Sequence, residues 1–305
     1  MSVRTAIDEV ESNVPGGEEG PHEYGIETLA IHAGASPEPV TGARNTPIYQ
    51  TTSYVFEDVE HAADLFNLQT FGFIYSRLTN PTVAVLEERM AALEGGRAAV
   101  CAASGHAVQF LAFFTLLEPG DEFISSLNLY GGSITQFGHS FKRLGWTGHF
   151  VDPTNPENFQ KALTPKCKAI FIEVLANPGG IVLDVEPIVA IAREAGIPLI
   201  VDNTSATPYL CRPIEHGATL VVHSTTKYLT GNGTVTGGCI VDSGKFDWKA
   251  AGDKFPSLTQ PNGSYHGAVL VDALEPIGPI AFITACRVLG LRDLGPAMAP
   301  QNAWL

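Results

Sequence analysis

The sequence has few residues of the kind that form covalent or metal cross-links. Its 305 residues include five cysteines, which are widely separated and contain no CxxC pair. This spacing favours free thiols in a reducing compartment over a disulfide framework. The nine histidines show no metal-ligand spacing, so no metal site is expected.

Long apolar runs and an excess of basic charge are also missing. No basic segment is followed by an apolar run at the N-terminus, and no stretch is long enough to cross a bilayer, so we predict neither a signal peptide nor a membrane span. A formal net charge of −14 argues against nucleic acid or an anionic membrane as the main partner. The composition, 45% hydrophobic and 16% charged, is typical of a compact protein, and we expect it in the cytoplasm.

The chain divides into three parts by composition. Residues 1–23 are acidic around a Pro-Gly-Gly turn and predict a flexible tail, and short apolar pieces up to residue 68 predict an arm. Residues 69–285 carry the regular pattern of one α/β domain. Residues 286–305 predict the start of a further C-terminal domain that is cut short.

Strands alternate with helices through the central part. Asn80-Pro81 is an N-cap and first-turn signal, and Gly95-Gly96 ends the helix that it begins. Strands are predicted at 98–103, 122–125, 169–174, 198–202, 220–223 and 238–241, and further helices at 104–117, 132–143, 156–163, 185–195 and 280–293. This alternation predicts a mainly parallel sheet that is covered by helices on both faces.

One strand leads directly to a lysine. The run at 220–223 continues as Ser224-Thr225-Thr226-Lys227 and is followed by glycines. Open α/β sheets bind ligands at the carboxyl ends of their strands, where desolvation would leave an amine able to form a Schiff base with an aldehyde. The hydroxyls of Ser224 and Thr226 can hold a phosphate. We therefore predict that Lys227 binds pyridoxal phosphate.

Pyridoxal phosphate also needs an acid at its ring nitrogen and packing on its ring. Asp202 ends the strand at 198–202 and can supply the acid, although capping of a turn is the alternative. Thr204 can touch the ring face. Tyr130 offers a ring for stacking and Asn177 an amide at the sheet edge, with ordinary packing and a turn asparagine as the alternatives.

A second phosphate donor is predicted at a helix start. Ser104-Gly105-His106 follows a strand directly, so the backbone N–H groups and the helix dipole favour an anion. Plain N-capping by Ser104 is the alternative. The histidines at 106, 223 and 266 are taken as structural by default, although His106 lies near the predicted cofactor.

Together these motifs resemble the Cys/Met-metabolism family of pyridoxal-phosphate enzymes, the trans-sulfuration group of the aspartate-aminotransferase-like fold (fold type I). The resemblance extends over nearly the whole chain from about residue 26 and is greatest to the O-acetylhomoserine sulfhydrylases. The motifs that carry it are Tyr75-Ser76-Arg77, Ser104-Gly105, Tyr130-Gly131-Gly132, Val201-Asp202-Asn203-Thr204 and Ser224-Thr225-Thr226-Lys227. Three stretches point to the sulfhydrylases: 28–34, 256–267 and 292–295.

The resemblance implies a seven-stranded sheet and a role for each site residue. Lys227, Tyr130 and Asp202 would be catalytic, with Lys227 as the proton shuttle and Asn177 facing the phenolic oxygen. The cofactor phosphate would be held by Ser104, Gly105, His106, Ser224 and Thr226, and Thr204 would touch the ring. Tyr75 and Arg77 would reach the phosphate of a neighbouring subunit, which implies a homo-oligomer, usually a tetramer built as a dimer of dimers.

The activity implied is γ-replacement on O-acetyl-L-homoserine with sulfide or methanethiol, which gives homocysteine or methionine plus acetate. Cystathionine γ-synthase or a γ-lyase of methionine or cystathionine remains an alternative, as does a cofactor-binding assembly protein without catalysis. Family members continue into a C-terminal domain that supplies an arginine for the substrate carboxylate. No residue of this chain evidently replaces it.

Overall fold

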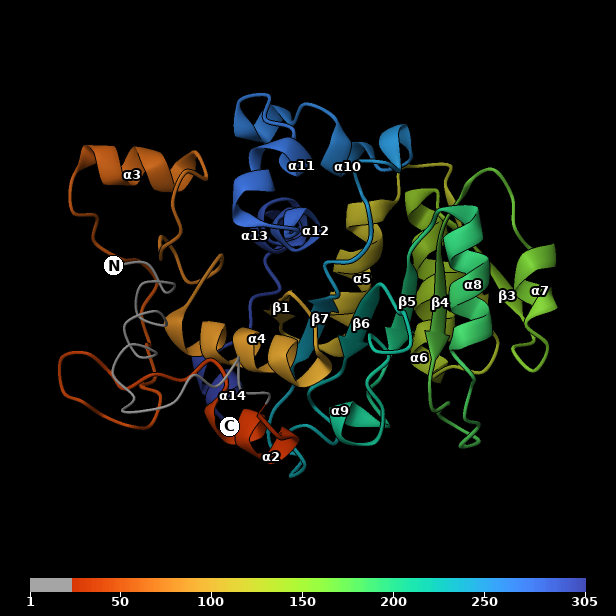
Figure 1. Cartoon of the computed structure of the whole chain (residues 1–305), viewed down its shortest axis with the longest axis horizontal. Coiled ribbons are helices and arrows are strands. Elements are labelled where there is room, and N and C mark those ends of the chain that lie inside the picture. The colour runs from red at the N-terminus through yellow and green to blue at the C-terminus, as the bar shows by residue number, and fades with distance from the viewer. Residues whose placement is uncertain (1–23) are drawn as a thin grey trace, which may run out of the picture.

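The computed structural model describes residues 24–305 and shows a seven-stranded sheet surrounded by helices (Figure 1). The acidic tail predicted at residues 1–23 lies outside the described residues. The strand order is β1-β7-β6-β5-β4-β2-β3, in which β7 is antiparallel to both β1 and β6 and the other pairs are parallel. The prediction of a mainly parallel sheet is confirmed. Within the described residues, no helix is both long and apolar enough to cross a membrane.

Six of the seven strands lie where the apolar runs predict them. The strands are β1 (Ala98–Ala102), β2 (Glu122–Ser126), β3 (Thr147–Val151), β4 (Cys167–Glu173), β5 (Leu199–Asp202), β6 (Leu220–His223) and β7 (Gly238–Asp242). Sequence reasoning missed β3. This strand lies at the sheet edge and none of its residues is fully buried, so it lacks the apolar run that marks the central strands.

Helices connect these strands and follow them. The principal helices are α2 (Ile26–His32), α3 (Val59–Phe66), α4 (Pro81–Glu94), α5 (Gly105–Leu116), α6 (Gly131–Thr135), α7 (Glu157–Lys161), α8 (Glu186–Ala195), α9 (Thr207–Leu210), α10 (Pro256–Thr259), α11 (Leu270–Ala273), α12 (Ala281–Ala285), α13 (Arg292–Leu294) and α14 (Pro300–Trp304). A π-helical stretch, Cys286–Leu291, joins α12 to α13. The predicted helix at 280–293 is therefore one continuous helical element.

Local sequence signals explain where α4 and α5 begin. The Asn80 side chain accepts hydrogen bonds from the backbone N–H groups of Thr82 and Val83, and Pro81 occupies the first helical position. In α5 the Ser104 hydroxyl accepts from the Ala107 N–H. Such caps satisfy donors that have no partner inside the helix, and each contributes about 1 kcal/mol.

Both faces of the sheet are buried. On one face α5 and α12 pack over the strands, and the cluster there includes several phenylalanines in mutual contact: Phe113, Phe123, Phe137, Phe141 and Phe171. On the other face α4 packs against β1 and β7 and α8 packs against β5, and the side chains there are mainly aliphatic. Residues on adjacent positions of one strand therefore enter different cores, which is why the central strands are apolar throughout.

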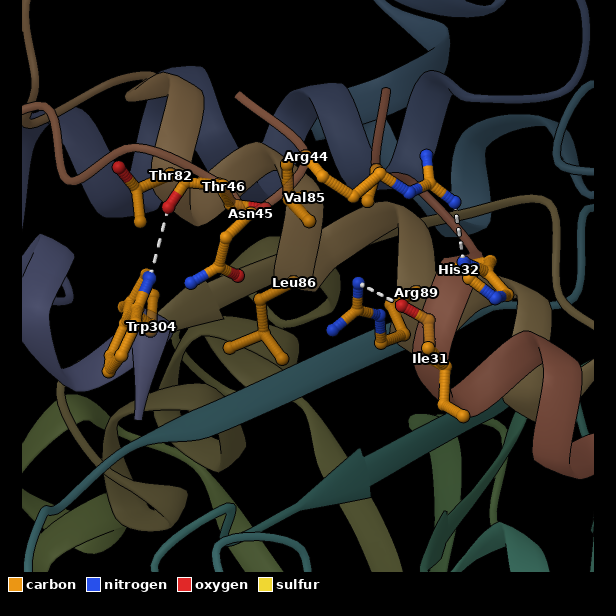
Figure 2. A pocket seen from close by; sticks show the side chains of 12 residues that line it. Ile31, His32, Arg44, Asn45, Thr46, Thr82, Val85, Leu86, Arg89 and Trp304 are labelled. Atoms are coloured by element: carbon orange, nitrogen blue, oxygen red, sulfur yellow. Dashed lines mark hydrogen bonds between the residues drawn. The ribbon is translucent and has the colours of Figure 1, made fainter. Parts of the chain in front are cut away.

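The predicted arm is fastened to α4 and α14 (Figure 2). The Trp304 indole N–H donates to the Thr46 carbonyl at 3.0 Å, and the Arg89 guanidinium donates to the carbonyls of Ile31 and Ala33 at the end of α2. A cavity of about 320 Å³ lies between these elements. The domain boundaries at residues 68 and 285 remain predictions.

Candidate active site

The carboxyl ends of three neighbouring strands bring the predicted site residues together. Asp202, the last residue of β5, lies opposite Glu173 on β4 and Val222 on β6 in the strand register. The loop that follows β6 carries Ser224 and Lys227 to the same edge. This convergence depends on the parallel arrangement of β4, β5 and β6, because parallel strands end at the same edge.

Asp202 is half-buried and held by two donors. The Gln109 amide donates to its Oδ2 at 3.1 Å, and the backbone N–H of Thr204 donates to its Oδ1 at 2.9 Å. Gln109 is itself oriented by the Ser133 hydroxyl, which donates to its Oε1 at 3.2 Å. The carboxylate is therefore fixed in direction, as a partner for a protonated ring nitrogen must be. Sequence reasoning missed Gln109, whose only signal is a polar residue among apolar ones in α5.

The first turn of α5 forms a cradle against the loop after β6. A Cβ on Gly105 would lie 2.7 Å from Ser224 Cβ, so only glycine allows this close approach. The N–H groups of Gly105 and His106 have no intrahelical partner because they lie in the first turn. They point, with the positive end of the helix dipole, toward the space an anion would occupy.

The hydroxyl groups around this cradle are not all free to bind an anion. Ser104 caps α5, as its alternative interpretation predicted. The Thr226 hydroxyl is bonded to Gly237, donating to its carbonyl at 3.2 Å and accepting from its N–H at 3.0 Å. Thr204 Oγ1 accepts from the Ser224 N–H at 2.8 Å and so ties the loop after β5 to the loop after β6.

Tyr130 and Asn177 lie on two loops that share one anchor. Tyr130 packs edge-on against the His106 ring at a centroid distance of 5.8 Å, and about half of its surface is exposed. Its backbone N–H donates to Glu173 Oε1 at 2.6 Å, and the Asn177 N–H donates to Glu173 Oε2 at 3.0 Å. Burial, together with the charge of Asp202, raises the pKa of Glu173 to about 7. Sequence reasoning did not assign Glu173 a role, although its place at the end of β4 beside Asp202 is the signal.

Lys227 differs from the sequence-based expectation in one respect. The argument for its reactivity assumed a desolvated amine, but its side chain is exposed in the described chain. The cause is its position: three residues separate it from the end of β6, so it lies in the turn-rich loop and not in the buried strand. Its backbone N–H bonds to the Ser224 carbonyl at 3.3 Å, which keeps it beside the cradle.

A second buried carboxylate, that of Glu94, bonds to residues adjacent to Asp202 and Ser224 in sequence. Glu94, at the end of α4, accepts hydrogen bonds on Oε1 from His223 Nε2 at 2.6 Å and from Asn203 Nδ2 at 2.8 Å. His223 directly precedes Ser224 and Asn203 directly follows Asp202, so this cluster ties the ends of β5 and β6 together. The expectation that His223 is structural agrees with this contact.

Tyr75 and Arg77 lie on the segment between α3 and α4. Both are exposed, and the Arg77 guanidinium lies 5.4 Å from the centroid of the Tyr75 ring. The charge of Arg77 also contributes to a lowered pKa of Asp293 on α13, after the larger effects of Arg292. The contacts that the described chain gives this pair do not include Asp202, Lys227 or the cradle.

The donor set fits a small ligand with three distinct groups. The first turn of α5 and Ser224 suit a phosphate, the fixed Asp202 carboxylate suits a basic ring nitrogen, and the Lys227 amine suits an aldehyde. Pyridoxal phosphate combines these groups in one molecule.

Comparison with known proteins agrees with this assignment. The sequence model described as "Cys/Met metabolism PLP-dependent enzyme" matches residues 27–305. The O-acetyl-L-homoserine sulfhydrylase of Leptospira meyeri is 50% identical over 95% of this chain, and sulfhydrylase 1 of Thermus thermophilus is 50% identical over 92%. The chain spans 66% of the length of each of these relatives. A crystal structure of a Campylobacter jejuni protein, described as an O-acetylhomoserine (thiol)-lyase with a pyridoxyl-lysine monophosphate, superposes with a TM-score of 0.87 at 38% identity, covering 92% of this chain and 68% of that one.

Proposed function

The chain belongs to the Cys/Met-metabolism family of PLP-dependent enzymes, and from that premise we propose that the protein is an O-acetylhomoserine sulfhydrylase. It would transfer the four-carbon amino-acid unit of O-acetyl-L-homoserine to sulfide or methanethiol, which gives homocysteine or methionine and releases acetate. The observation that carries this proposal is the meeting of Lys227, Asp202 and the first turn of α5 at one sheet edge in a chain 50% identical to such enzymes.

Lys227 and Asp202 would have different roles in the reaction. Lys227 Nζ would bind the cofactor aldehyde and, when displaced by the substrate amine, accept the substrate α-proton, for which its exposed loop leaves access. Asp202 would hold a proton at the ring nitrogen. Bound pyridoxal phosphate supplies an electron sink for the charge left on the substrate.

The remaining residues would orient the ring and its phosphate. The N–H groups of Gly105 and His106, with the Ser224 hydroxyl, would bind the phosphate, and Ser104 would support them as the cap of α5. The Thr226 hydroxyl would join them by turning away from the Gly237 carbonyl. Tyr130 would cover one ring face and Thr204 the other, with Asn177 at the phenolic oxygen. The predicted roles of these residues are part of the proposal.

We also propose that the protein acts as a homo-oligomer in the cytoplasm, with Tyr75 and Arg77 completing the phosphate site of a neighbouring subunit. Support comes from their exposure and from the contacts given for them in the described chain, which join neither residue to the cradle. The same segment exposes Phe71 at 59% and Phe73 at 38%, and the residues before it expose Val55 at 97% and Val59 at 86%. Apolar side chains exposed to this degree on one segment are typical of surfaces that another chain covers.

A substrate panel tests the activity. Acetyl, succinyl and phospho esters of homoserine would each be combined with sulfide, methanethiol and cysteine, and acetate, succinate or phosphate release measured. We expect sulfide-dependent release to be greatest with the acetyl ester. Lys227→Ala should lower it by about 10²–10⁴-fold or more, the range for loss of a proton-transfer group.

Other outcomes of the panel identify the alternatives. A preference for cysteine would indicate γ-synthase chemistry, and an α-keto acid formed without any thiol would indicate a γ-lyase. A protein that binds the cofactor and releases nothing from any ester, with Lys227→Ala equal to the wild type, would contradict the proposal.

A further inference from the structure

Glu173 connects two loops that are far apart in sequence. It is the last residue of β4 and only 4% exposed. Its two carboxylate oxygens accept from the N–H groups of Tyr130, in the loop between β2 and α6, and Asn177, in the loop after β4. One side chain thus fixes the backbone of both residues that the proposed function places against the cofactor ring.

The other backbone hydrogen bonds of these loops act within each loop: the Tyr130 carbonyl accepts from the Ser133 N–H, and the Ala176 N–H donates to the Ile181 carbonyl. Tyr130 is 49% exposed, and Asn177 is exposed as well, so packing contributes little to their placement. Hydrogen bonds from N–H groups to an ionised carboxylate are shorter and about twice as strong as neutral ones. The Tyr130 nitrogen lies 2.6 Å from Glu173 Oε1, which is shorter than the usual N–H···O separation of about 2.9 Å.

We propose that Glu173 is a positioning residue of the cofactor site, which holds Tyr130 and Asn177 at the ring through their backbone N–H groups. The proposal rests on the proposed function, since it takes these two residues to contact the cofactor. It adds a residue that does not touch the ring itself and that acts through two others.

The ionisation state of Glu173 decides how many of the two bonds form. As a carboxylate it accepts from both N–H groups, whereas protonation converts one oxygen into a donor and removes one bond. The charged group facing it is Asp202 on β5; from the loop side it meets backbone N–H groups, beyond which lie the rings of Tyr130 and His106. Burial and Asp202 together raise the pKa of Glu173 to about 7, so the second bond forms as pH rises through neutrality.

The first measurement uses the cofactor-free chain. Backbone amide NMR signals of Tyr130 and Asn177 would be followed from pH 5.5 to 8.5. We expect both signals to move downfield together with one midpoint near 7, set by the Glu173 carboxyl. Signals that stay constant, or that titrate with different midpoints, would overturn the proposal whether or not any variant folds.

The second measurement compares cofactor affinity in matched variants. Glu173→Gln keeps the shape of the side chain but replaces one acceptor oxygen with an amide that faces an N–H group. Glu186→Gln is the control, because that carboxylate is exposed on α8 and bonds only to His216 in the described chain. Binding of pyridoxal phosphate would be measured by absorbance and by quenching of protein fluorescence at pH 6 and pH 8.

At pH 8 we expect Glu173→Gln to bind the cofactor about tenfold more weakly than the wild type, the effect of one lost charged hydrogen bond. At pH 6 the difference should shrink to about twofold, because the wild type has also lost one bond. The control should match the wild type at both pH values. A purely structural role would weaken binding equally at both.

Equal affinities of Glu173→Gln and the wild type at pH 8, or an equal loss at both pH values, would overturn the proposal. Failure of the proposed function is distinguishable from this result. In that case the wild type itself would not bind the cofactor, while the joint titration of the Tyr130 and Asn177 amides would still report on Glu173.

Discussion

Two buried glutamates lie near the carboxyl end of β5, one beside Asp202 in the sheet and one bonded to Asn203, and they have different partners. Glu94 accepts from two side chains, His223 and Asn203, and neither it nor His223 has any exposed surface. Within residues 24–305, Glu173 accepts only from backbone N–H groups, which belong to two surface loops. The first contact joins elements of the core, whereas the second sets the position of loops at the site.

The difference teaches what each carboxylate can affect. Removing Glu94 leaves buried polar side chains without their acceptor, and three atoms of this cluster already have no partner within the described residues: Glu94 Oε2, Asn203 Oδ1 and His223 Nδ1. Removing Glu173 releases N–H groups that water can reach, because their loops are exposed. We therefore expect Glu94 to govern stability and Glu173 to govern ligand affinity.

The largest expected effect is on stability, from Glu94→Ala. His223 Nε2 would lose its partner and Asn203 would keep only the Cys211 carbonyl. Removing one partner of such a buried group costs about 3–5 kcal/mol of the free energy of unfolding. Urea denaturation would measure it, with the exposed Glu186→Ala as a control expected within about 0.5 kcal/mol of the wild type.

Two results would contradict this difference between the glutamates. Glu94→Ala could lower the free energy of unfolding by less than about 1 kcal/mol, or Glu173→Gln could lower it as much as Glu94→Ala does. Either result would mean that the partners of a carboxylate do not decide between a stabilising and a positioning role. The threshold of about 1 kcal/mol is the typical contribution of one hydrogen bond to the free energy of unfolding.

A third buried carboxylate, that of Asp242, has fewer hydrogen-bond donors than Glu94 or Glu173 and can be compared with them. Asp242, at the end of β7, accepts from the Gly244 N–H, and its Oδ2 has no partner in the described part of the chain. Burial raises its pKa to about 7. The folded protein therefore holds this proton more tightly than the unfolded chain does, so the free energy of unfolding falls as pH rises from about 4 to about 7.

Asp242→Asn should remove that loss. We expect the variant to be more stable than the wild type at pH 8, by on the order of 3 kcal/mol, and close to it at pH 4.5. Denaturant midpoints at the two pH values measure the change. If Asp242→Asn is less stable than the wild type at pH 8, the ionised Asp242 carboxylate is stabilised by a partner. Asp242 could then not serve as the example of a buried carboxylate with too few partners.

The sequence predicted most of the fold because the central strands are buried on both faces. Their continuous apolar runs, such as the one at 220–223, and capping signals such as Asn80-Pro81 are local features that can be recognised without tertiary information. β3 was missed because an edge strand with partly exposed residues has no such run. The helix at 280–293 was predicted, but its π-helical turn was not, since that depends on packing.

The candidate site was predictable only where residues follow a strand or begin a helix. Asp202 and Lys227 follow β5 and β6 in sequence, so their meeting at one edge follows from a parallel sheet. Gln109 and Glu94 could not be found in this way, because each reaches its partner from a helix more than 90 positions away. The exposure of Lys227 also depends on how its loop turns, which no local signal gives.

The smallest expected effect, and the one that sharpens the comparison most, is that of Gln109→Leu. Gln109 is buried like Glu94, yet its amide serves Asp202 at the site edge. Leucine has a similar volume and leaves Asp202 Oδ2 without its donor, but Asp202 as a residue is only half-buried, so stability should fall by about 1 kcal/mol. Cofactor affinity should fall about three- to tenfold, because the carboxylate loses one of the two bonds that fix its direction.

Urea denaturation and cofactor titration of the same samples measure both quantities. A variant with unchanged affinity and a stability loss like that of Glu94→Ala would show that burial of the altered side chain, and not the identity of its partner, decides its effect. We do not expect Gln109→Asn to bind the cofactor as tightly as the wild type. The asparagine side chain is one methylene shorter, so its amide cannot reach Asp202 Oδ2, which Gln109 contacts at 3.1 Å, unless α5 moves.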